Sequence, residues 1–517
     1  MSTPMPYADL GVIMRPVPGS LPARQAQVSA EQLVGLCHAV RKGGGRLLTL
    51  WGADDRDQGR GFALYVVLQD LQRLVVVHMR LSAADPCYPD LSEVFSCAER
   101  LQRATYDLLG MRAIGGDERW WLRHGTWPAP TFPLRRHVEG SADVLSGSAA
   151  YAFIRVEGDG VHEIAVGPVH AGIIEPGHFR FSVVGEKVLR LEERLGYVHK
   201  GIEKRFESLL LTEGACLAAR ICGDSAIAFA WAYAMAAEAL TATTVSERAL
   251  SLRALLLERE RIANHLGDLG ALGNDAGLAF GLTQFSRLKE DFLRVNAATW
   301  GQRYLMDAIV PGGTCVDVSE LDSRVLVDSM LRLETEVQTL REIYDNHAGL
   351  QDRFMGTGCV TGDLVEQLGV IGLAARASGS RQDWRCDMPV APYESLNVRL
   401  AVHSKGDVAA RVAVRFDELV ESMRLCRMLL QTLPAGPLET ALGSTQDGIG
   451  IGGVEGWRGP VFVALDADAD GRIRRCHPHD PSWQNWPVIE YAAIDNIVPD
   501  FPLINKSFNL SYSGHDL

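Results

Sequence analysis

The stretch ARICGDSAIAFAWAYAMAA, residues 219–237, joins a short polar turn to the most apolar window of the chain. The window runs from Ser225 to Ala237 and is followed by Glu238, so it is shorter than the about 20 residues that a membrane-spanning helix needs. The pattern predicts a helix buried in a protein core. Asp224 or Ser225 is placed to cap its first turn.

Helical periodicity extends outward from this window over most of the later chain. Apolar residues recur at spacings of three and four, which places them on one face of a helix. The predicted helices cover about residues 187–211, 224–241, 246–270, 285–306, 322–348, 363–377 and 411–432. In the first of these, apolar residues from Leu191 to Leu209 form one stripe. A short β-like segment at 151–184 precedes the helices, and short strands, loops and an irregular tail are expected after Val461.

The amino-terminal part shows a different pattern. From Glu31 to about Leu134, short β-rich runs alternate with helical stretches at 31–42 and 93–109, which predicts a small α+β domain. Gly and Ser then dominate residues 135–151, as in a linker. We therefore expect an α+β protein with an amino-terminal domain at 1–136, a linker at 137–150 and a mainly helical domain at 151–517.

Composition narrows the classes of function. A length of 517 residues exceeds one compact core. The net charge of −13, without clustered Lys and Arg, argues against nucleic acid as a partner. The first residues lack the pattern of a signal peptide, which predicts a cytoplasmic protein. The ten cysteines include no Cys-x-x-Cys pair, so we expect mostly buried thiols and no disulfide framework.

Three local patterns resemble known motifs but favour other interpretations. GIGIGG at 448–453 fits a dinucleotide fingerprint, yet a strand follows it where a helix should begin. DADADG at 466–471 resembles the start of a calcium loop, but His477 stands where a bidentate glutamate is required, so a hairpin turn is expected. Cys476, His477 and His479 are capable of binding metal, but we interpret them as part of a solvated loop.

A series of spaced motifs carries a family resemblance. They are GPVHAGIIEPGHFRF (167–181), LGYVHKGIEK (195–204), ARICGDSA (219–226), ERERIANHLGDLGAL (258–272), RYLMDAIVPGG (303–313), ARASGSRQDWR (375–385), GDVAARVAVRFDE (406–418), EGWRG (455–459) and FPLINKSFNLSYSGHDL (501–517). The chain resembles the large subunit of membrane-bound group-four nickel–iron hydrogenases of the formate hydrogenlyase type, and the 49-kDa-type subunit of complex I. AERLQRATYDLLGMRAIG, residues 98–115, is similar to the 30-kDa-type subunit.

In such hydrogenases the resemblance implies four cysteine thiolates around nickel and iron, because soft thiolates suit these metals better than oxygen donors do. Matched position by position, the first ligand element keeps Cys222 but has Ser225 in place of its partner. The second element has Ser511 and Gly514. We therefore expect no metal and no other cofactor in this chain, no hydrogenase activity, and Cys222 as a buried thiol.

The complex I relatives imply a quinone pocket with a His and a Tyr as hydrogen-bond donors. His170 matches the first position, whereas the Tyr position falls at Gly223, so the donor pair is incomplete. Arg220 and Arg458 match polar positions of the family that face its cofactor cleft. The association of this family with NAD comes from the resemblance alone.

Ionisable residues of the predicted helices suggest a route for protons. His199 and Glu203 would share one helical face at i, i+4 spacing, and burial would raise the pKa of Glu203 toward neutrality. Glu175 and His178, beside a Pro-Gly turn, form a second candidate cluster. A structural ion pair is the alternative interpretation of His199 and Glu203. Among the family's polar residues we expect Arg–carboxylate pairing, because buried unpaired charges are costly.

The resemblance implies a peripheral subunit on the cytoplasmic face of the cell membrane. Its partners would be a small subunit with a four-iron cluster and antiporter-like membrane subunits, and it would couple electron transfer or docking to proton or ion movement. The alternative is a redox-inactive scaffold of an ion or inorganic-carbon transporter.

Overall fold

The computed structural model describes residues 10–71, 73–124, 127, 131–137, 151–171 and 174–517. Its amino-terminal part is built on a mixed five-stranded sheet in the order β1-β2-β5-β4-β3. The elements are β1 (Arg15–Pro16), β2 (Ala23–Gln27), α1 (Ala30–Lys42), β3 (Arg46–Asp54), β4 (Phe62–Asp70), β5 (Arg73–Leu81), β6 (Cys87–Pro89), α2 (Ala98–Leu109) and β7 (Arg112–Ile114). Only β2 and β5 pair in parallel within this sheet. This part confirms the predicted small α+β region.

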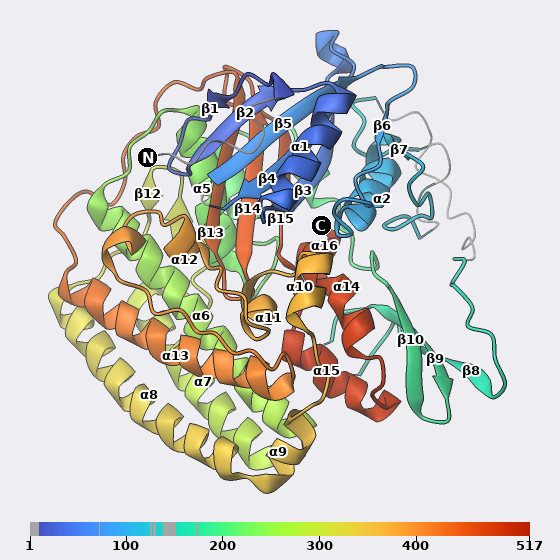
Figure 1. The fold of residues 1–517 in the computed structure, drawn as a ribbon. Coiled ribbons are helices and arrows are strands. Elements are labelled where there is room, and N and C mark those ends of the chain that lie inside the picture. The colour runs from blue at the N-terminus through green and yellow to red at the C-terminus, as the bar shows by residue number, and fades with distance from the viewer. Residues whose placement is uncertain (1–9, 72, 125–126, 128–130, 138–150, 172–173) are drawn as a thin grey trace.

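The later chain is mainly helical, as the periodicity predicts, and Figure 1 shows α6, α7, α8 and α13 side by side along one side of the molecule. The elements are α3 (Ile202–Phe206), α4 (Leu211–Ala218), α5 (Ala226–Leu240), α6 (Glu247–Asp275), α7 (Ala279–Trp300), β11 (Ile309–Val310), β12 (Gly313–Thr314), α8 (Glu320–Asn346), α9 (Ala348–Phe354), α10 (Gly362–Leu368), α11 (Gly372–Arg376), α12 (Trp384–Asp387) and α13 (Val408–Gln431). The helix predicted over 363–377 is interrupted, because Gly369 and Gly372 adopt positive φ.

The apolar window forms α5, and every residue of this helix is buried. A three-stranded antiparallel sheet packs on it, with β13 (Gly448–Glu455), β14 (Pro460–Ala467) and β15 (Ile473–His479). The GIGIGG segment is thus a strand and not a loop. A Cβ atom at Gly450 or Gly452 would lie 2.2 or 2.0 Å from a carbonyl oxygen of α5. The glycines therefore allow close packing of strand on helix. The predicted hairpin turn after β14 is confirmed.

The predicted helix over 187–211 is wrong. Its first part is β10 (Lys187–Arg194), which pairs with β9 (His178–Val184), and β9 pairs with β8 (Val161–Val166). A loop leads from β10 to the short helix α3. The apolar residues of this segment recur at helical spacing, but polar residues at the end of β10 are also buried, which conceals the alternation typical of a strand.

Two expectations about the carboxyl-terminal part are also wrong. Cys476, His477 and His479 belong to the buried strand β15 and not to a solvated loop. The tail is helical and largely buried, with α14 (Ser482–Ala492), α15 (Phe501–Phe508) and α16 (Ser513–Asp516). All ten cysteines are free, but only five are buried, so the expectation of mostly buried thiols holds for half of them.

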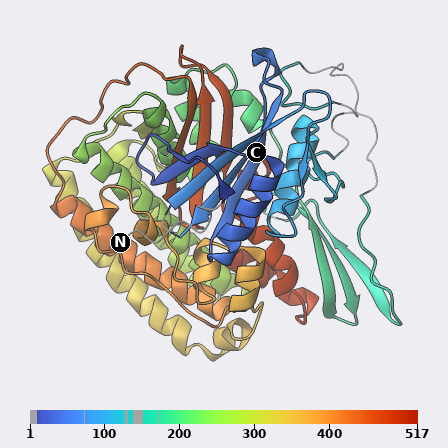
Figure 2. The same ribbon diagram turned by 45° about the horizontal axis from the view of Figure 1, so that its top comes forward.

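The two parts of the chain meet along a seam at β3, which contacts both α2 and β15. Figure 2 shows the amino-terminal sheet lying across the later elements. Although β3 is an edge strand of its sheet, all nine of its residues are buried. Most of the predicted linker, residues 138–150, lies outside the described residues, and the domain limits stay predictions. Among the described residues, no helix is both long and apolar enough to cross a membrane.

Candidate functional site

Cys222 lies in the turn before α5, with its side chain buried. Its sulfur is 2.9 Å from Asp224 Oδ1 and 3.0 Å from Ser511 Oγ, so residues far apart in sequence meet here. Burial, and then the charge of Asp224, raise the pKa of the thiol well above its ordinary value. At neutral pH Cys222 is therefore a neutral thiol that donates a hydrogen bond to Asp224.

The other three positions of the ligand set offer no sulfur. Ser225 occupies the N-cap position of α5, but its side chain makes no capping hydrogen bond, contrary to the expectation. Ser511 Oγ accepts a hydrogen bond from the backbone N–H of Gly514 at 2.8 Å. A Cβ at Gly514 would lie 2.6 Å from Asp480 Oδ2, so no larger side chain fits without rearrangement. These residues do not fit a four-thiolate centre.

A guanidinium group lies beside these positions. Arg458 Nη1 is 2.7 Å from Asp224 Oδ1, 3.3 Å from Ser225 Oγ and 3.9 Å from Cys222 Sγ. The same group packs 4.0 Å from the ring centroid of Trp457. Burial alone would raise the pKa of Asp224, but Arg458 brings it below its ordinary value. The carboxylate is therefore ionised, and an ion pair organises the turn that precedes α5.

Behind the turn lies a buried network of arginines and carboxylates. Glu418 accepts hydrogen bonds from Arg376 at 2.7 Å and from His265 at 2.9 Å, and Arg376 also donates to Glu455 at 2.8 Å. Arg376 and His265 are fully buried. Further pairs confirm the expected Arg–carboxylate pairing. They are Arg385–Asp383, Arg385–Glu258, Arg415–Asp268 and Arg253–Glu238.

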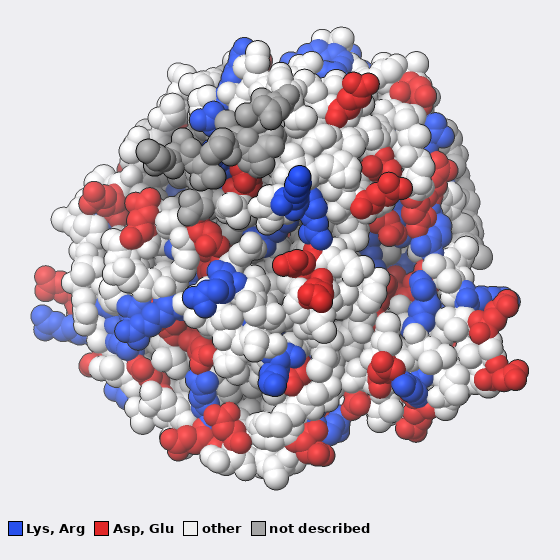
Figure 3. All heavy atoms as spheres, in the orientation of Figure 1, with Lys and Arg blue, Asp and Glu red and all other residues white. Residues whose placement is uncertain are grey.

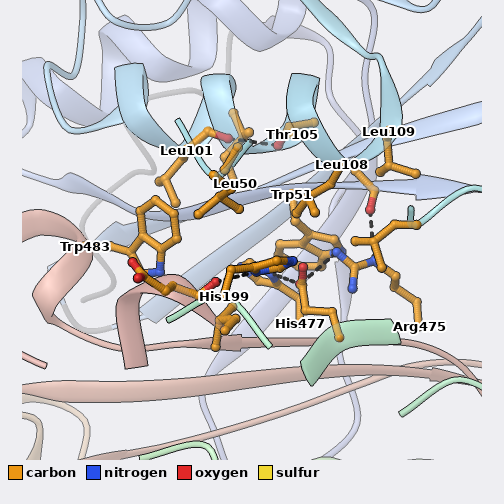
Figure 4. Close-up of a pocket in the computed structure, with 17 residues that line it drawn as sticks. Leu50, Trp51, Leu101, Thr105, Leu108, Leu109, His199, Arg475, His477 and Trp483 are labelled. Carbon is orange, nitrogen blue, oxygen red and sulfur yellow. Dashed lines mark hydrogen bonds and ion pairs between the residues drawn. The ribbon is translucent and has the colours of Figure 1, made fainter. Parts of the chain in front are cut away.

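An internal cavity of about 30 Å³ lies at the seam, and both parts of the chain line it (Figure 4). His477 is central: its Nδ1 is 2.9 Å from Glu203 Oε1 and its Nε2 is 2.8 Å from Thr49 Oγ1. Its ring stacks on Trp51 with 4.7 Å between centroids. Arg475 also pairs with Glu203, at 2.8 Å. The cavity thus combines a buried ion pair with an aromatic wall.

His199 and Glu203 both line this cavity, but not in the predicted way. His199 lies in the loop before α3, and its Nδ1 is 2.8 Å from the carbonyl oxygen of Asp516. Glu203 lies in α3, so the two do not share one helical face. Burial raises the pKa of Glu203, but Arg475 and His477 outweigh it and lower the value to about 2. The expectation of a raised pKa is therefore wrong, and Glu203 is ionised at neutral pH.

Comparisons with known proteins identify the family of this chain. The sequence models of the 30-kDa and 49-kDa subunits of respiratory-chain NADH dehydrogenase match residues 26–144 and 275–446. Formate hydrogenlyase subunit 5 of Escherichia coli (strain K12) is 31% identical over 490 residues, which cover 92% of this chain and 85% of that protein. The chain belongs to this hydrogenase and complex I family.

Two further comparisons extend over much of the chain. Hydrogenase-4 component G of Escherichia coli (strain K12) is 29% identical, with 91% of this chain and 84% of that protein covered. A chain of the membrane-bound sulfane sulfur reductase, an archaeal respiratory membrane complex, has 24% identity and a TM-score of 0.66. The matched region covers 69% of this chain and 98% of the reductase chain, and it shows that the two chains share a fold.

His170 and Gly223 are the two positions that the sequence analysis matched to a quinone pocket. His170 Nε2 lies 2.7 Å from the carbonyl oxygen of Gly177, so this nitrogen is engaged within its own loop. A Cβ at Gly223, the position matched to the Tyr, would meet no atom within 4 Å. Gly223 lines a second small cavity of about 20 Å³, together with Asp224 and Glu260.

The other residues that the sequence proposed for a proton path or a cofactor site make separate contacts. Glu175 Oε2 accepts from the backbone N–H of Ser513 at 3.3 Å, whereas His178 lies on β9, and its Nδ1 is 3.4 Å from the Gly167 carbonyl oxygen. Arg220 is half exposed and paired with Asp307 at 2.6 Å. Arg458 alone of these candidates contacts the former ligand positions.

Three residues of the site were not predicted to contribute to it. Asp224 was considered only as a cap, and His477 was assigned to a loop. Glu260 accepts from the backbone N–H groups of Ile227 and Ala228, and burial raises its pKa to about 8. An acidic residue inside the Cys-Gly-x-Ser turn was the available signal for Asp224. The pairing of Glu203 with His477 joins residues 274 positions apart, which local patterns do not reveal.

Proposed function

We propose that this chain is a peripheral-arm subunit of a membrane-bound oxidoreductase complex that lacks a nickel–iron centre of its own. One observation carries the proposal: the chain belongs to the hydrogenase and complex I family, yet Arg458, Asp224 and Ser511 surround the single remaining cysteine. The nearest polar contact of Cys222 is the carboxylate of Asp224, which accepts a hydrogen bond from the thiol. Redox catalysis therefore belongs to the assembly and not to this chain.

The proposed partners follow from the family. They are an iron–sulfur small subunit with a four-iron cluster and antiporter-like membrane subunits, and the chain would lie on the cytoplasmic face of the membrane. Support comes from the relatives, which include subunits of formate hydrogenlyase and hydrogenase-4. The face drawn in Figure 3 has acidic and basic side chains intermixed.

The seam cavity is the place that we propose for proton binding and transfer. His199 and His477 line it, and Glu203 is held ionised by Arg475. Burial is the main cause that lowers the pKa of His477. In this proposal the ionised Glu203, 2.9 Å from His477 Nδ1, stabilises a proton that His477 takes up against the effect of burial. Glu175 and His178 stay candidates for a separate path. A quinone at His170 would require the Nε2 contact with Gly177 to be released.

The test uses the intact complex purified from membranes of the native host. We expect this chain to copurify with membrane subunits, with far less than one nickel atom per chain by elemental analysis, and with an electron paramagnetic resonance signal of a reduced four-iron cluster. Nickel near one atom per chain would contradict the metal-free proposal. A complex without any iron–sulfur signal would instead support the scaffold alternative.

A further inference from the structure

Two carboxylates and one guanidinium meet at the seam, away from the Cys222 site. Arg100 of α2 pairs with Glu193 of β10 through Nη1, and its Nη2 lies 2.9 Å from Glu490 Oε1 of α14. The backbone N–H of Glu193 also donates to Glu490 Oε1 at 2.9 Å. The cluster therefore joins the amino-terminal part to two elements of the later chain.

Burial makes the charge of this cluster important. The side chain of Glu193 is 0% exposed, that of Arg100 is 9% exposed and that of Glu490 is 20% exposed. Two ionised carboxylates against one guanidinium would leave one net negative charge in a buried place, which is costly. Glu193 Oε2 has no hydrogen-bond partner among the described residues. One oxygen is thus free to carry a proton.

Among the described residues, no second cation lies within ion-pair distance of Glu193 or Glu490, although Arg190 acts on Glu490 from farther away and lowers its pKa in part. Other charged groups near the cluster are Glu99, Arg103, Arg119 and Glu192, and its titratable neighbours include Tyr151, Tyr491, Tyr512 and His515. Arg119 is already bound to Asp117 and Glu192, at 2.6 and 2.9 Å. Arg190 forms no ion pair within 4.0 Å with any described residue. Burial, against the effect of Arg100, raises the pKa of both Glu193 and Glu490.

A cleft of about 220 Å³ gives this cluster access to solvent. The cluster residues line it together with Tyr491, which is 44% exposed. Protons can therefore enter and leave without unfolding of the seam. This distinguishes the cluster from the network around Glu418, which is buried on every side.

We propose that Glu193 and Glu490 hold one proton between them at neutral pH, which makes this cluster a proton-binding site at the seam. Two carboxyl groups that share one proton behave as a single coupled acid. With the proton bound, the cluster carries one positive charge on Arg100 and one negative charge on the carboxyl pair. After the proton is lost, two ionised carboxylates share Arg100. Proton release therefore weakens the seam. This inference does not rest on the proposed redox role.

Infrared spectroscopy of the full-length protein tests this by counting protonated carboxyl groups at pH 7. We expect Glu193→Gln and Glu490→Gln each to lack one protonated carboxyl band that the wild type shows. Glu99→Gln is the matched control, because Glu99 lines the same cleft outside the cluster, and it should keep the band. Equal band intensity in wild type and Glu193→Gln would overturn the proposal. Loss in Glu193→Gln alone would overturn the sharing of the proton.

A second measurement covers the case in which a variant does not fold. Wild type and Glu260→Gln are titrated between pH 5 and pH 9, because burial also raises the pKa of Glu260 to about 8. The carboxyl band that Glu260→Gln keeps should disappear reversibly as pH rises. Thermal unfolding over the same range should show stability falling with rising pH. A band in Glu260→Gln that is already lost at pH 6 would overturn the proposal without any variant of the cluster.

Discussion

Arg458 and Asp224 form an ion pair directly beside Cys222, with 2.7 Å between Nη1 and Oδ1. This pair occupies the surroundings of the first ligand element of the family, and the cysteine sulfur donates to the same carboxylate.

Replacement of Cys222 by alanine should leave assembly and activity nearly unchanged. The thiol is hydrogen-bonded to Asp224 and Ser511 in a small buried space, so a loss of about 1–2 kcal/mol in unfolding free energy is expected. Urea unfolding and the yield of assembled complex measure this. A collapse of activity in a complex that still assembles would contradict a packing role.

Replacement of Glu418 by glutamine should destabilise the protein by about 3–5 kcal/mol, because it removes the carboxylate that the buried side chains of Arg376 and His265 share, and leaves His265 without an ionised partner. Asp417→Asn is the control. Asp417 is the neighbour of Glu418 on α13, but it is 33% exposed and paired with Arg341, so a loss of at most about 1 kcal/mol is expected. Urea unfolding at pH 7 compares the two variants. Similar losses for both would refute the importance of the buried network.

Glu203 should stabilise the protein at neutral pH and lose this effect in acid. Its folded-state pKa of about 2 lies below the ordinary value of 4.5, so its stabilisation is present above pH 4.5 and lost as pH falls toward 2. The linkage amounts to about 3 kcal/mol. Unfolding of wild type and Glu203→Gln at pH 7 and pH 3 should show a difference that shrinks by about half in acid. A difference independent of pH would rule out this linkage.

Two glycines should differ sharply in their response to alanine. A Cβ at Gly223 meets nothing within 4 Å, so Gly223→Ala should change unfolding free energy by less than about 1 kcal/mol. At Gly452 a Cβ would lie 2.0 Å from the carbonyl oxygen of Ala232, so Gly452→Ala should cost at least about 2 kcal/mol. Calorimetry compares the melting temperatures. Equal melting temperatures would mean that β13 does not depend on its close approach to α5.

Long helices were predictable from the sequence. The helices α6 and α13 lie close to their predicted limits because their apolar residues recur at helical spacing, and α5 does so because it is a continuous apolar window. The strand β10 was not predictable, since its polar residues Glu192 and Glu193 are buried in ion pairs with distant arginines. Tertiary pairing there removes the alternation on which strand prediction depends.

The candidate site shows the same division. Cys222, Ser225, Ser511 and Gly514 were matched to the family's ligand positions from motifs alone. In the structure, the Cys222 sulfur and the backbone N–H of Gly514 both bond to Ser511 Oγ. The partners that determine their chemistry could not be identified in this way. Arg458 lies 234 residues from Asp224, and His477 lies 428 residues from Thr49. Such contacts arise from the fold as a whole.

The wall of the seam cavity joins Trp51 from one part of the chain to His477 and Glu203 from the other, and the hydroxyl of Thr49 is hydrogen-bonded to His477. Because both parts belong to one polypeptide, each meets the other at an effective concentration of the order of mM, whatever the abundance of the protein. Two separate chains would have to find each other by diffusion before His477 gained its hydroxyl partner. Fusion thus makes completion of this cavity an intramolecular step.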